Sequence, residues 1–249
     1  MNLQINFQEN AINEKKIVNK FYQPVKSVID YITKKCEENK YEKILDIGPG
    51  YFPFSKATHF IDHLPDPSGK YDYIKLDINQ DKFPFYNQYF DFCYSRHTLE
   101  DIYNPYHAFY EMTRLSNSGY IETPSPMIEI LKNVDEVCID NSSNIIEYCG
   151  YHHHRYIVWS DLSNNTLNFL PKMPIIETIL INEILEKKLL YLANNFPIFW
   201  NNYYIWDKTK KPNINMVLYD INTYADIIIN AIEKSIEYTL DFEKKCTSV

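Results

Sequence analysis

Short hydrophobic segments that end in polar residues recur through the first half of the chain. Five segments have the length and composition of buried strands: KILDIG (43–48), ATHFIDHL (57–64), YDYIKLDI (71–78), FDFCYS (90–95) and GYIETPSP (119–126). Apolar residues at helical spacing precede them at 14–40, and a further helix is predicted from about Pro105 to Leu115. Strands that alternate with helices predict an α/β fold with a mainly parallel sheet.

The second half of the chain has a different pattern. HRYIVWSD (154–161) and TLNFL (166–170) flank Asn164-Asn165 and predict a small hairpin. Residues 175–194 predict an amphipathic helix, and a last helix is expected from Thr223 to about Lys245. NYYIWD (202–207) and NINMVLYD (213–220) predict an antiparallel strand pair.

Composition narrows the classes of function. The 249 residues are 45% hydrophobic and 16% aromatic, enough for a large core, and the net charge of −8 disfavours nucleic-acid binding, which depends on Lys and Arg. Five scattered cysteines without a CxxC pair indicate reduced thiols, so we expect a cytoplasmic protein. The sequence has no long apolar run, so no membrane partner is expected.

Acidic residues close the first three predicted strands. Asp46 runs into Gly48-Pro49-Gly50, where the glycines let the backbone approach a ligand closely. Asp62 ends the second strand, and Asp77, followed by Ile78, ends the third. Because the carboxyl ends of parallel strands share one edge of a sheet, these side chains are candidates for one ligand site. The alternatives are an ordinary strand-to-helix turn for the glycines, and helix caps or solvated loop positions for the aspartates.

Taken together, LDIGPG, FID, LDIN, FPFYNQYFDFCYSRHTLED and GYIE resemble the class I S-adenosylmethionine-dependent methyltransferases over about residues 40–125. The resemblance implies a Rossmann-like three-layer sandwich with an antiparallel C-terminal strand pair, and S-adenosylmethionine as cofactor. It places the turn Asp46, Gly48, Pro49 and Gly50 at the methionine portion, Asp62 at ribose, and Asp77 with Ile78 at adenine. Ser95 belongs to the segment SRHTLEDI, which is similar to the family's fourth-strand motif.

The chain departs from the family pattern in the first turn. Tyr51-Phe52-Pro53-Phe54 stands where a third glycine is common, and the spacing from Asp46 to Asp62 leaves little room for a full first helix. We therefore expect that helix to be short or replaced by a turn, which weakens any contribution of a helix dipole. A dehydrogenase needs this helix for its pyrophosphate, so the departure disfavours a dehydrogenase more than a methyltransferase.

The catalytic candidates are histidines, since imidazole can take a proton near neutral pH. GYHHHRYIVW, with LEDIYNP and GYIETPSP, resembles a type-11-like subgroup with an HHR motif that is associated with surface sugars, which favours His153 or His154 as base or substrate contact. His97 is a second candidate, either as base or as pocket wall. Glu100, Asp101, Glu122 and Arg155 are candidates for binding the acceptor. For the histidine run, the alternative is a surface or loop-packing role, and for Arg155 a structural ion pair.

Glu100, Asp101, Glu122 and the histidines also include suitable ligands for a divalent metal. A site without metal is favoured, with a divalent metal as the open alternative, because no compact motif such as HExxH occurs and adjacent histidines in a strand face opposite sides.

The predicted function is O-methylation of a sugar, nucleotide sugar or glycan. Methylation of another small metabolite, or a binding subunit without catalysis, are alternatives, and a homo-oligomer stays open. We expect a single domain over 1–249, since no linker divides the chain. Its predicted parts are a helical segment (14–40), a cofactor-binding half (41–126), an insertion on the substrate side (127–174), a helix with the closing strand pair (175–220) and a terminal helix (221–249).

Overall fold

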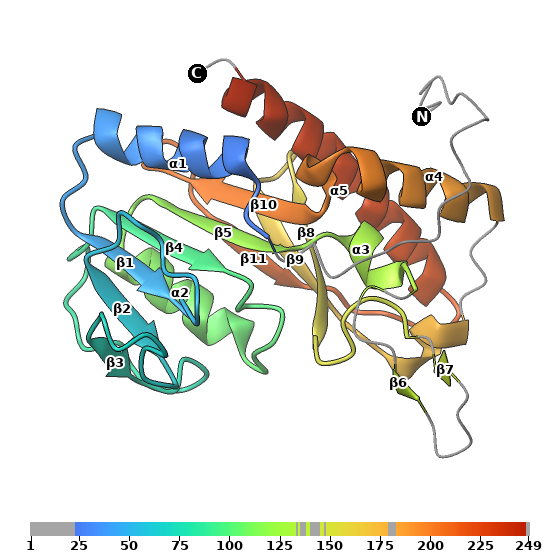
Figure 1. Ribbon diagram of the computed structural model, residues 1–249, viewed down its shortest axis with the longest axis horizontal. Helices are drawn as coiled ribbons and strands as arrows, with labels where there is room; N and C mark the ends of the chain where they lie inside the picture. The colour runs from blue at the N-terminus through green and yellow to red at the C-terminus, as the bar shows by residue number, and fades with distance from the viewer. Residues whose placement is uncertain are drawn as a thin grey trace.

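A six-stranded sheet forms the centre of the computed structural model, which describes residues 23–132, 134, 138–139, 145–146, 148–178 and 183–247 (Figure 1). Its strands are β1 (Ile44–Ile47), β2 (His59–Asp62), β3 (Tyr73–Lys75), β4 (Phe92–Arg96), β5 (Gly119–Pro124) and β10 (Asn201–Trp206). The order is β10-β5-β4-β1-β2-β3, with β10 antiparallel to β5 and all other neighbours parallel. The predicted α/β class, with a mainly parallel sheet and an antiparallel pair, is confirmed.

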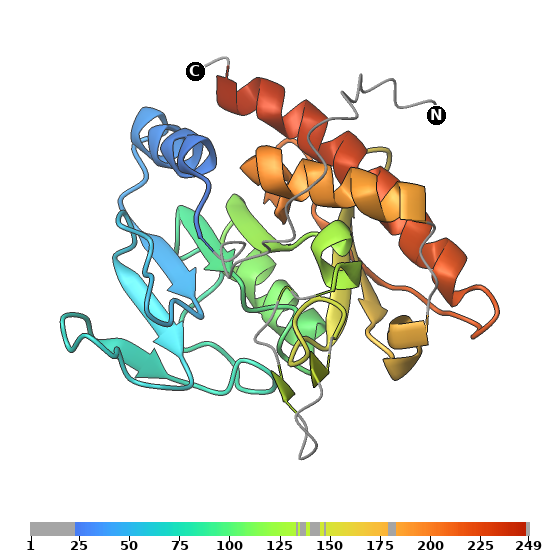
Figure 2. The same cartoon turned by 45° about the vertical axis from the view of Figure 1, so that its right-hand side comes forward.

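Two hydrophobic cores lie on opposite faces of this sheet. Ile44 of β1 packs into the core beneath α1 (Lys26–Glu38) and α5 (Tyr224–Thr247), whereas the next residue, Leu45, packs into the core beneath α2 (Pro105–Leu115). Side chains alternate in the same way along β4 and β5, as the period of two in a strand requires. The cartoons show α1, α4 and α5 on one side of the sheet and α2 on the other, which gives the three layers (Figure 2).

Helix α1 begins just after Pro24, so the proline precedes a fresh helix start in the described part of the chain. Val28, Ile32 and Cys36 are spaced by four residues and form its buried stripe. The part of the expected helical segment before residue 23 lies outside the described residues.

A second sheet, of order β11-β9-β8, lies beyond β10. The predicted hairpin is confirmed as β8 (Tyr156–Asp161) paired antiparallel with β9 (Thr166–Pro171). The predicted pairing of 202–207 with 213–220 is wrong, because β10 pairs along its whole length with β5 and β11 (Asn213–Met216) runs parallel to β9. Side-chain amides favour this register, since Asn215 Nδ2 donates to Asn168 Oδ1 at 3.0 Å.

The remaining elements are short, apart from one helix. They are α3 (Pro126–Ile130), β6 (Cys138–Ile139), β7 (Ile145–Ile146), η2 (Pro174–Thr178), α4 (Glu183–Asn195) and η3 (Pro197–Phe199). The helix expected at 175–194 thus corresponds to the 3-10 turn η2 and to α4, with 179–182 outside the described residues.

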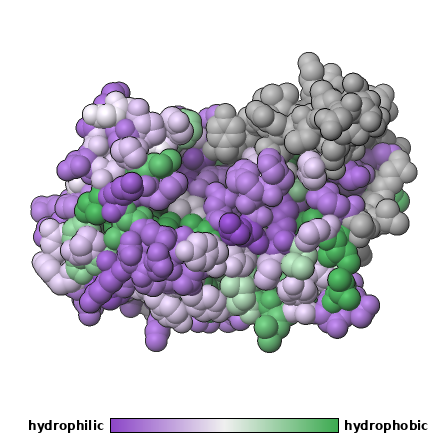
Figure 3. Space-filling view, turned by 90° about the horizontal axis from the view of Figure 1, so that it is seen from below, coloured by the Kyte–Doolittle hydropathy of each residue, from purple (hydrophilic) through white to green (hydrophobic). Residues whose placement is uncertain are grey.

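No helix in the described part of the chain has both the length and the apolar character needed to cross a bilayer. Seen from below the view of Figure 1, hydrophobic residues form separate areas among hydrophilic ones (Figure 3).

The connection from β1 to β2 contains turns and no helix, as the spacing of Asp46 and Asp62 predicted. It starts at Gly48, which has a φ of +69° and lies against Thr98; a Cβ added there would meet Thr98 Oγ1 at 2.3 Å and Cγ2 at 2.4 Å. Thr98 cannot move away freely, because its hydroxyl donates to the Gly48 carbonyl at 3.2 Å and the side chain is nearly buried. The position therefore requires glycine for two independent reasons.

We predict that Gly48→Ala lowers the free energy of unfolding by about 2–4 kcal/mol, since it combines left-handed strain with overpacking. Gly69→Ala is the matched control: Gly69 has a φ of +66°, but an added Cβ meets nothing within 4 Å. It should cost only about 1 kcal/mol. Denaturant unfolding of both variants measures the difference, and equal losses would show that the contact with Thr98 imposes no constraint.

Candidate functional site

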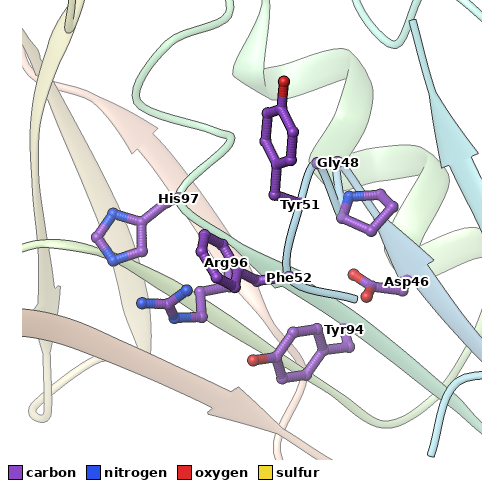
Figure 4. Close-up of a pocket in the computed structure, with 9 residues that line it drawn as sticks. Asp46, Gly48, Tyr51, Phe52, Tyr94, Arg96 and His97 are labelled. Atoms are coloured by element: carbon purple, nitrogen blue, oxygen red, sulfur yellow. The ribbon is translucent and has the colours of Figure 1, made fainter. Parts of the chain in front are cut away.

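A cavity of about 200 Å³ lies at the carboxyl ends of β1 and β4 (Figure 4). The glycine turn forms one wall, and the last residues of the two strands form the other. In the view of Figure 4, Asp46 and His97 lie at opposite ends. The lining residues are Asp46, Gly48, Pro49, Gly50, Tyr51, Phe52, Tyr94, Arg96 and His97. Four residues predicted to bind cofactor, and one predicted catalytic residue, therefore share this cavity.

Asp46 is a buried carboxylate in the cavity wall, with 1% of its surface exposed. The backbone N–H of Phe54 donates to its Oδ2 at 2.7 Å. Burial raises the pKa of Asp46 to about 7, against the opposing effect of that hydrogen bond and with a further contribution from Asp62. A cation entering the cavity would favour the ionised form.

Asp62 supports the glycine turn from outside the cavity lining. Its Oδ2 accepts from the N–H of Gly50 at 3.1 Å, and its Oδ1 accepts from the N–H of Leu64 at 3.1 Å. The Tyr73 hydroxyl donates to the Gly50 carbonyl at 3.2 Å, so both backbone groups of Gly50 are held. Oδ1 also lies 2.9 Å from His63 Nδ1, so Oδ2 is the oxygen that keeps a lone pair for another donor, although only 8% of the side chain is exposed.

Asp77, Ile78 and Ser95 are not among the residues that line the cavity. β3 ends at Lys75, so Asp77 lies in the next turn, where Oδ1 accepts from the backbone N–H of Asn79 at 3.0 Å. This bond, with that of the Asn79 side chain, lowers the pKa of Asp77. Ile78 is buried in the core on the α2 side of the sheet, and Ser95 Oγ donates to the Ile47 carbonyl at 2.9 Å, which ties β4 to β1.

Two aromatic rings stack where the glycine turn approaches the sheet. Phe54 follows the turn and lies on Tyr94 of β4, with ring centroids 4.4 Å apart and planes within 8°. Tyr94 also lines the cavity, so the stack joins the turn to the cavity wall. The segment Tyr51 to Phe54, which stands where the family commonly has a third glycine, thus contributes the ring of Phe54 to this stack.

Glu122 organises the polar end of the cavity. It lies on β5 with 1% exposure; its Oε1 accepts from Arg96 Nε at 2.9 Å and from Asn201 Nδ2 at 2.9 Å, and its Oε2 accepts from the Tyr120 hydroxyl. Burial opposes ionisation, but the contacts with His97 and Arg96 hold the pKa of Glu122 below its usual value. It is therefore an anion that fixes Arg96, and Arg96 is the residue that reaches the cavity.

His97 connects the cavity with a second polar group. Its backbone is left-handed, with a φ of 50°, and its N–H donates to the Glu122 carbonyl at 2.9 Å. Its ring lies between two carboxylates: Nε2 is 3.7 Å from Glu122 Oε1, and Nδ1 is 3.6 Å from Glu100 Oε1. Burial lowers the pKa of His97, so the neutral ring predominates near pH 7.

The second polar group surrounds His154. Its Nδ1 lies 2.7 Å from Glu129 Oε1, and Lys172 Nζ lies 2.6 Å from Glu129 Oε2. Burial opposes protonation, but Glu129 raises the pKa of His154 to about 9. Burial and then Asp101 raise the pKa of Glu100 to about 8.

Arg155 holds the backbone at Glu100 and Asp101 through two hydrogen bonds. Its Nε donates to the Asp101 carbonyl at 2.9 Å, and its N–H donates to the Glu100 carbonyl at 2.8 Å. Asp101 Oδ1 faces the rings of His153 and His154 at 3.8 and 3.7 Å.

The structure brings all seven predicted catalytic and acceptor-binding residues into one continuous polar region. These are His97, Glu100, Asp101, Glu122, His153, His154 and Arg155. Sequence reasoning missed Tyr94, Arg96, Glu129 and Lys172. Arg96 belongs to the SRHTLEDI segment and Tyr94 directly precedes it, so the strand-end argument could have found both. Glu129 and Lys172 carry no local signal.

Comparisons with known proteins give a limited result. No protein-family model and no curated protein matches the sequence. Among solved structures, the chain is similar to a methyltransferase from Clostridium acetobutylicum (13% identity, TM-score 0.35, 56% of this chain and 84% of that one). Another, from Mesorhizobium loti, matches at 15% identity and a TM-score of 0.32, over 49% of this chain and 66% of that one. Both are described as S-adenosylmethionine-dependent. At these identities and TM-scores the likeness carries no conclusion about activity.

Proposed function

We propose that the protein is an S-adenosylmethionine-dependent methyltransferase. The observation that carries the proposal is the pair of opposite charges in one cavity, Asp46 and Arg96, beneath a glycine turn. The methionine portion of S-adenosylmethionine carries an ammonium group and a carboxylate. Asp46 can accept hydrogen bonds from the ammonium group, and Arg96 can donate to the carboxylate. The resemblance of LDIGPG and SRHTLEDI to class I methyltransferases supports the same ligand.

The size of the cavity fits the amino-acid portion of this ligand. At about 200 Å³ it is smaller than the roughly 300–1,000 Å³ of pockets that enclose a whole drug-sized molecule. The nucleoside would then lie along the sheet edge outside the cavity, beside Gly50 and Asp62, which are bonded at 3.1 Å. A ribose hydroxyl would donate to the remaining lone pair of Asp62 Oδ2.

We assign proton removal to His97. It is the histidine that lines the cavity among the described residues, and its pKa is lowered, so a neutral ring can accept a proton from an acceptor hydroxyl. His154 Nδ1 lies 2.7 Å from Glu129, which raises the pKa of His154 to about 9; its ring is therefore mainly protonated near pH 7 and less suited to accept a proton. When bound, S-adenosylmethionine supplies a methyl group whose bond to sulfur breaks as the acceptor oxygen forms the new C–O bond.

For the acceptor, we propose a sugar, nucleotide sugar or glycan. The carboxyl group of Glu100 lies next to His97 and that of Asp101 next to His154, and both have oxygens that can accept from the hydroxyls of a polyol. Arg155 is exposed, its Nε donates to the Asp101 carbonyl at 2.9 Å, and its guanidinium suits a carboxylate or phosphate of the acceptor. The net charge of −8 disfavours nucleic acid as the acceptor.

The raised pKa of Asp46 predicts a pH-dependent affinity. Below pH 7 the carboxyl is mainly neutral in the free protein, so the affinity for S-adenosylmethionine should rise as the pH increases from 5.5 to 7.5. The rise should level off near pH 8, where the α-amino group of the ligand, with a pKa of roughly 7.7–8.0, loses its charge. Calorimetric titration across this range measures the effect.

Asp46→Asn should bind more weakly at pH 7.5 and lose most of the pH dependence. Asp30→Asn, on the exposed side of α1, is the matched control and should follow the wild-type curve. If Asp46→Asn keeps the wild-type slope, another group is responsible and the ammonium does not contact Asp46.

Turnover tests the activity and the assignment of the base together. We predict that the protein converts S-adenosylmethionine to S-adenosylhomocysteine with a hydroxyl acceptor, detected in a carbohydrate panel by a mass gain of about 14 Da, the mass of one CH₂ group. His97→Gln should lower kcat by about 10²- to 10⁴-fold, the usual contribution of a general base, with a much smaller change in cofactor affinity.

Two results would contradict this scheme. A greater loss of kcat in His153→Gln than in His97→Gln would move the base to the histidine run. Tight cofactor binding without turnover across sugar and other metabolite acceptors would favour a binding subunit.

A further inference from the structure

His153 and His154 converge on one carboxylate oxygen. Their Nε2 atoms lie 3.8 and 3.7 Å from Asp101 Oδ1, and one ligand atom from each of the three residues lies within 4.8 Å of the others. The sequence argued against joint ligation because adjacent residues of a strand face opposite sides. However, β8 begins only at Tyr156, and His153 lies in the turn before it. The alternation of a strand therefore does not apply, and the rings can lie only 4.5 Å apart.

Glu129 fixes the orientation of the His154 ring on the side away from Asp101. Its Nδ1 is bonded to Glu129, which Lys172 holds on the opposite oxygen, while Nε2 points towards Asp101. A carboxylate on one ring nitrogen and a ligand atom on the other is the arrangement that orients metal-binding histidines in proteins. With 5% of its side chain exposed, His154 has little freedom to turn away.

Buried carboxylate oxygens around this cluster lack hydrogen bonds. Asp101 Oδ1 and both oxygens of Glu100 have no hydrogen-bond partner among the residues that the structure describes. An unsatisfied buried carboxylate is costly, and such a group calls for a bound ion or an ordered water. The unsatisfied Asp101 oxygen is the atom that the two histidines face.

We propose that Asp101, His153 and His154 bind one divalent transition-metal ion of the zinc type. Bonds of about 2.0–2.1 Å in a tetrahedral site place ligand atoms roughly 3.3 Å apart. The two distances to Asp101 therefore need to shorten by a few tenths of an ångström, within the reach of side-chain rotation. The side chains of Asp101 and His153 are 39% and 54% exposed, so an ion can reach them from solvent. Two imidazoles with one carboxylate favour zinc, cobalt or iron(II) over magnesium, which prefers oxygen ligands.

Metal binding can be measured without cofactor or acceptor, so the result is independent of the proposed methyl transfer. The full chain, freed of metal with a chelator, is titrated with Zn²⁺ by calorimetry, and with Co²⁺ by visible absorption, which reports coordination geometry. We expect one ion per chain, and a Zn²⁺ affinity at least a hundredfold above that for Mg²⁺.

Variants locate the ion. Asp101→Asn and His153→Ala should each weaken Zn²⁺ binding at least tenfold, whereas His152→Ala, in the same histidine run, should leave it unchanged. His154→Ala removes the partner of buried Glu129 and is therefore read together with its thermal unfolding; His153 is exposed, so its variant tests the site without that risk.

Three outcomes would overturn the site. They are a wild-type chain without saturable Zn²⁺ binding, equal losses in His152→Ala and His153→Ala, or Mg²⁺ bound as tightly as Zn²⁺.

Discussion

The buried anion at Glu122 is the interaction on which the polar half of the site depends. Its oxygens hold side chains from three neighbouring strands: Arg96 on β4, Tyr120 on β5 and Asn201 on β10. Removing one partner of a buried ion pair typically costs about 3–5 kcal/mol, because the other charge is left without compensation. The same group that fixes the arginine of the cavity therefore also fastens the antiparallel edge strand to the parallel sheet.

Burial of charge also explains why acidic residues in this region behave differently from one another. Glu122 and Glu129 are ionised because a cation touches each of them, whereas Asp46 and Glu100 are buried with no such contact and their pKa values are raised. Asp46 lines the cavity, and Glu100 Oε1 lies 3.6 Å from His97 Nδ1. A cationic ligand next to either carboxyl group would favour its ionised form and lower its pKa.

Much of the fold could be predicted from sequence because its signals are local. The buried strands are continuous apolar runs, and the lack of room for a helix between Asp46 and Asp62 follows from a count of residues. The failures are non-local. β11 pairs with β9 instead of β10, since β10 is already occupied along its length by β5, and no pattern within 213–220 contains that information. Likewise, Asp77 was expected at a strand end, but β3 stops at Lys75 and the side chain caps its own turn.

Both edges of the central sheet are protected against pairing with another chain. At one edge, β3 has only three residues, too few to template a long ladder. At the other, β10 is bordered by the second sheet, whose Ser160 donates from Oγ to the Tyr203 carbonyl at 2.6 Å and from its backbone N–H to Asn202 Oδ1 at 2.7 Å. Hydrogen bonds that involve the side chains of Ser160 and Asn202 thus replace a regular backbone ladder at this edge of the central sheet. Because β3 and β10 are protected in this way, the sheet can keep an open polar cavity at the carboxyl ends of its strands without exposing an edge strand that would template aggregation.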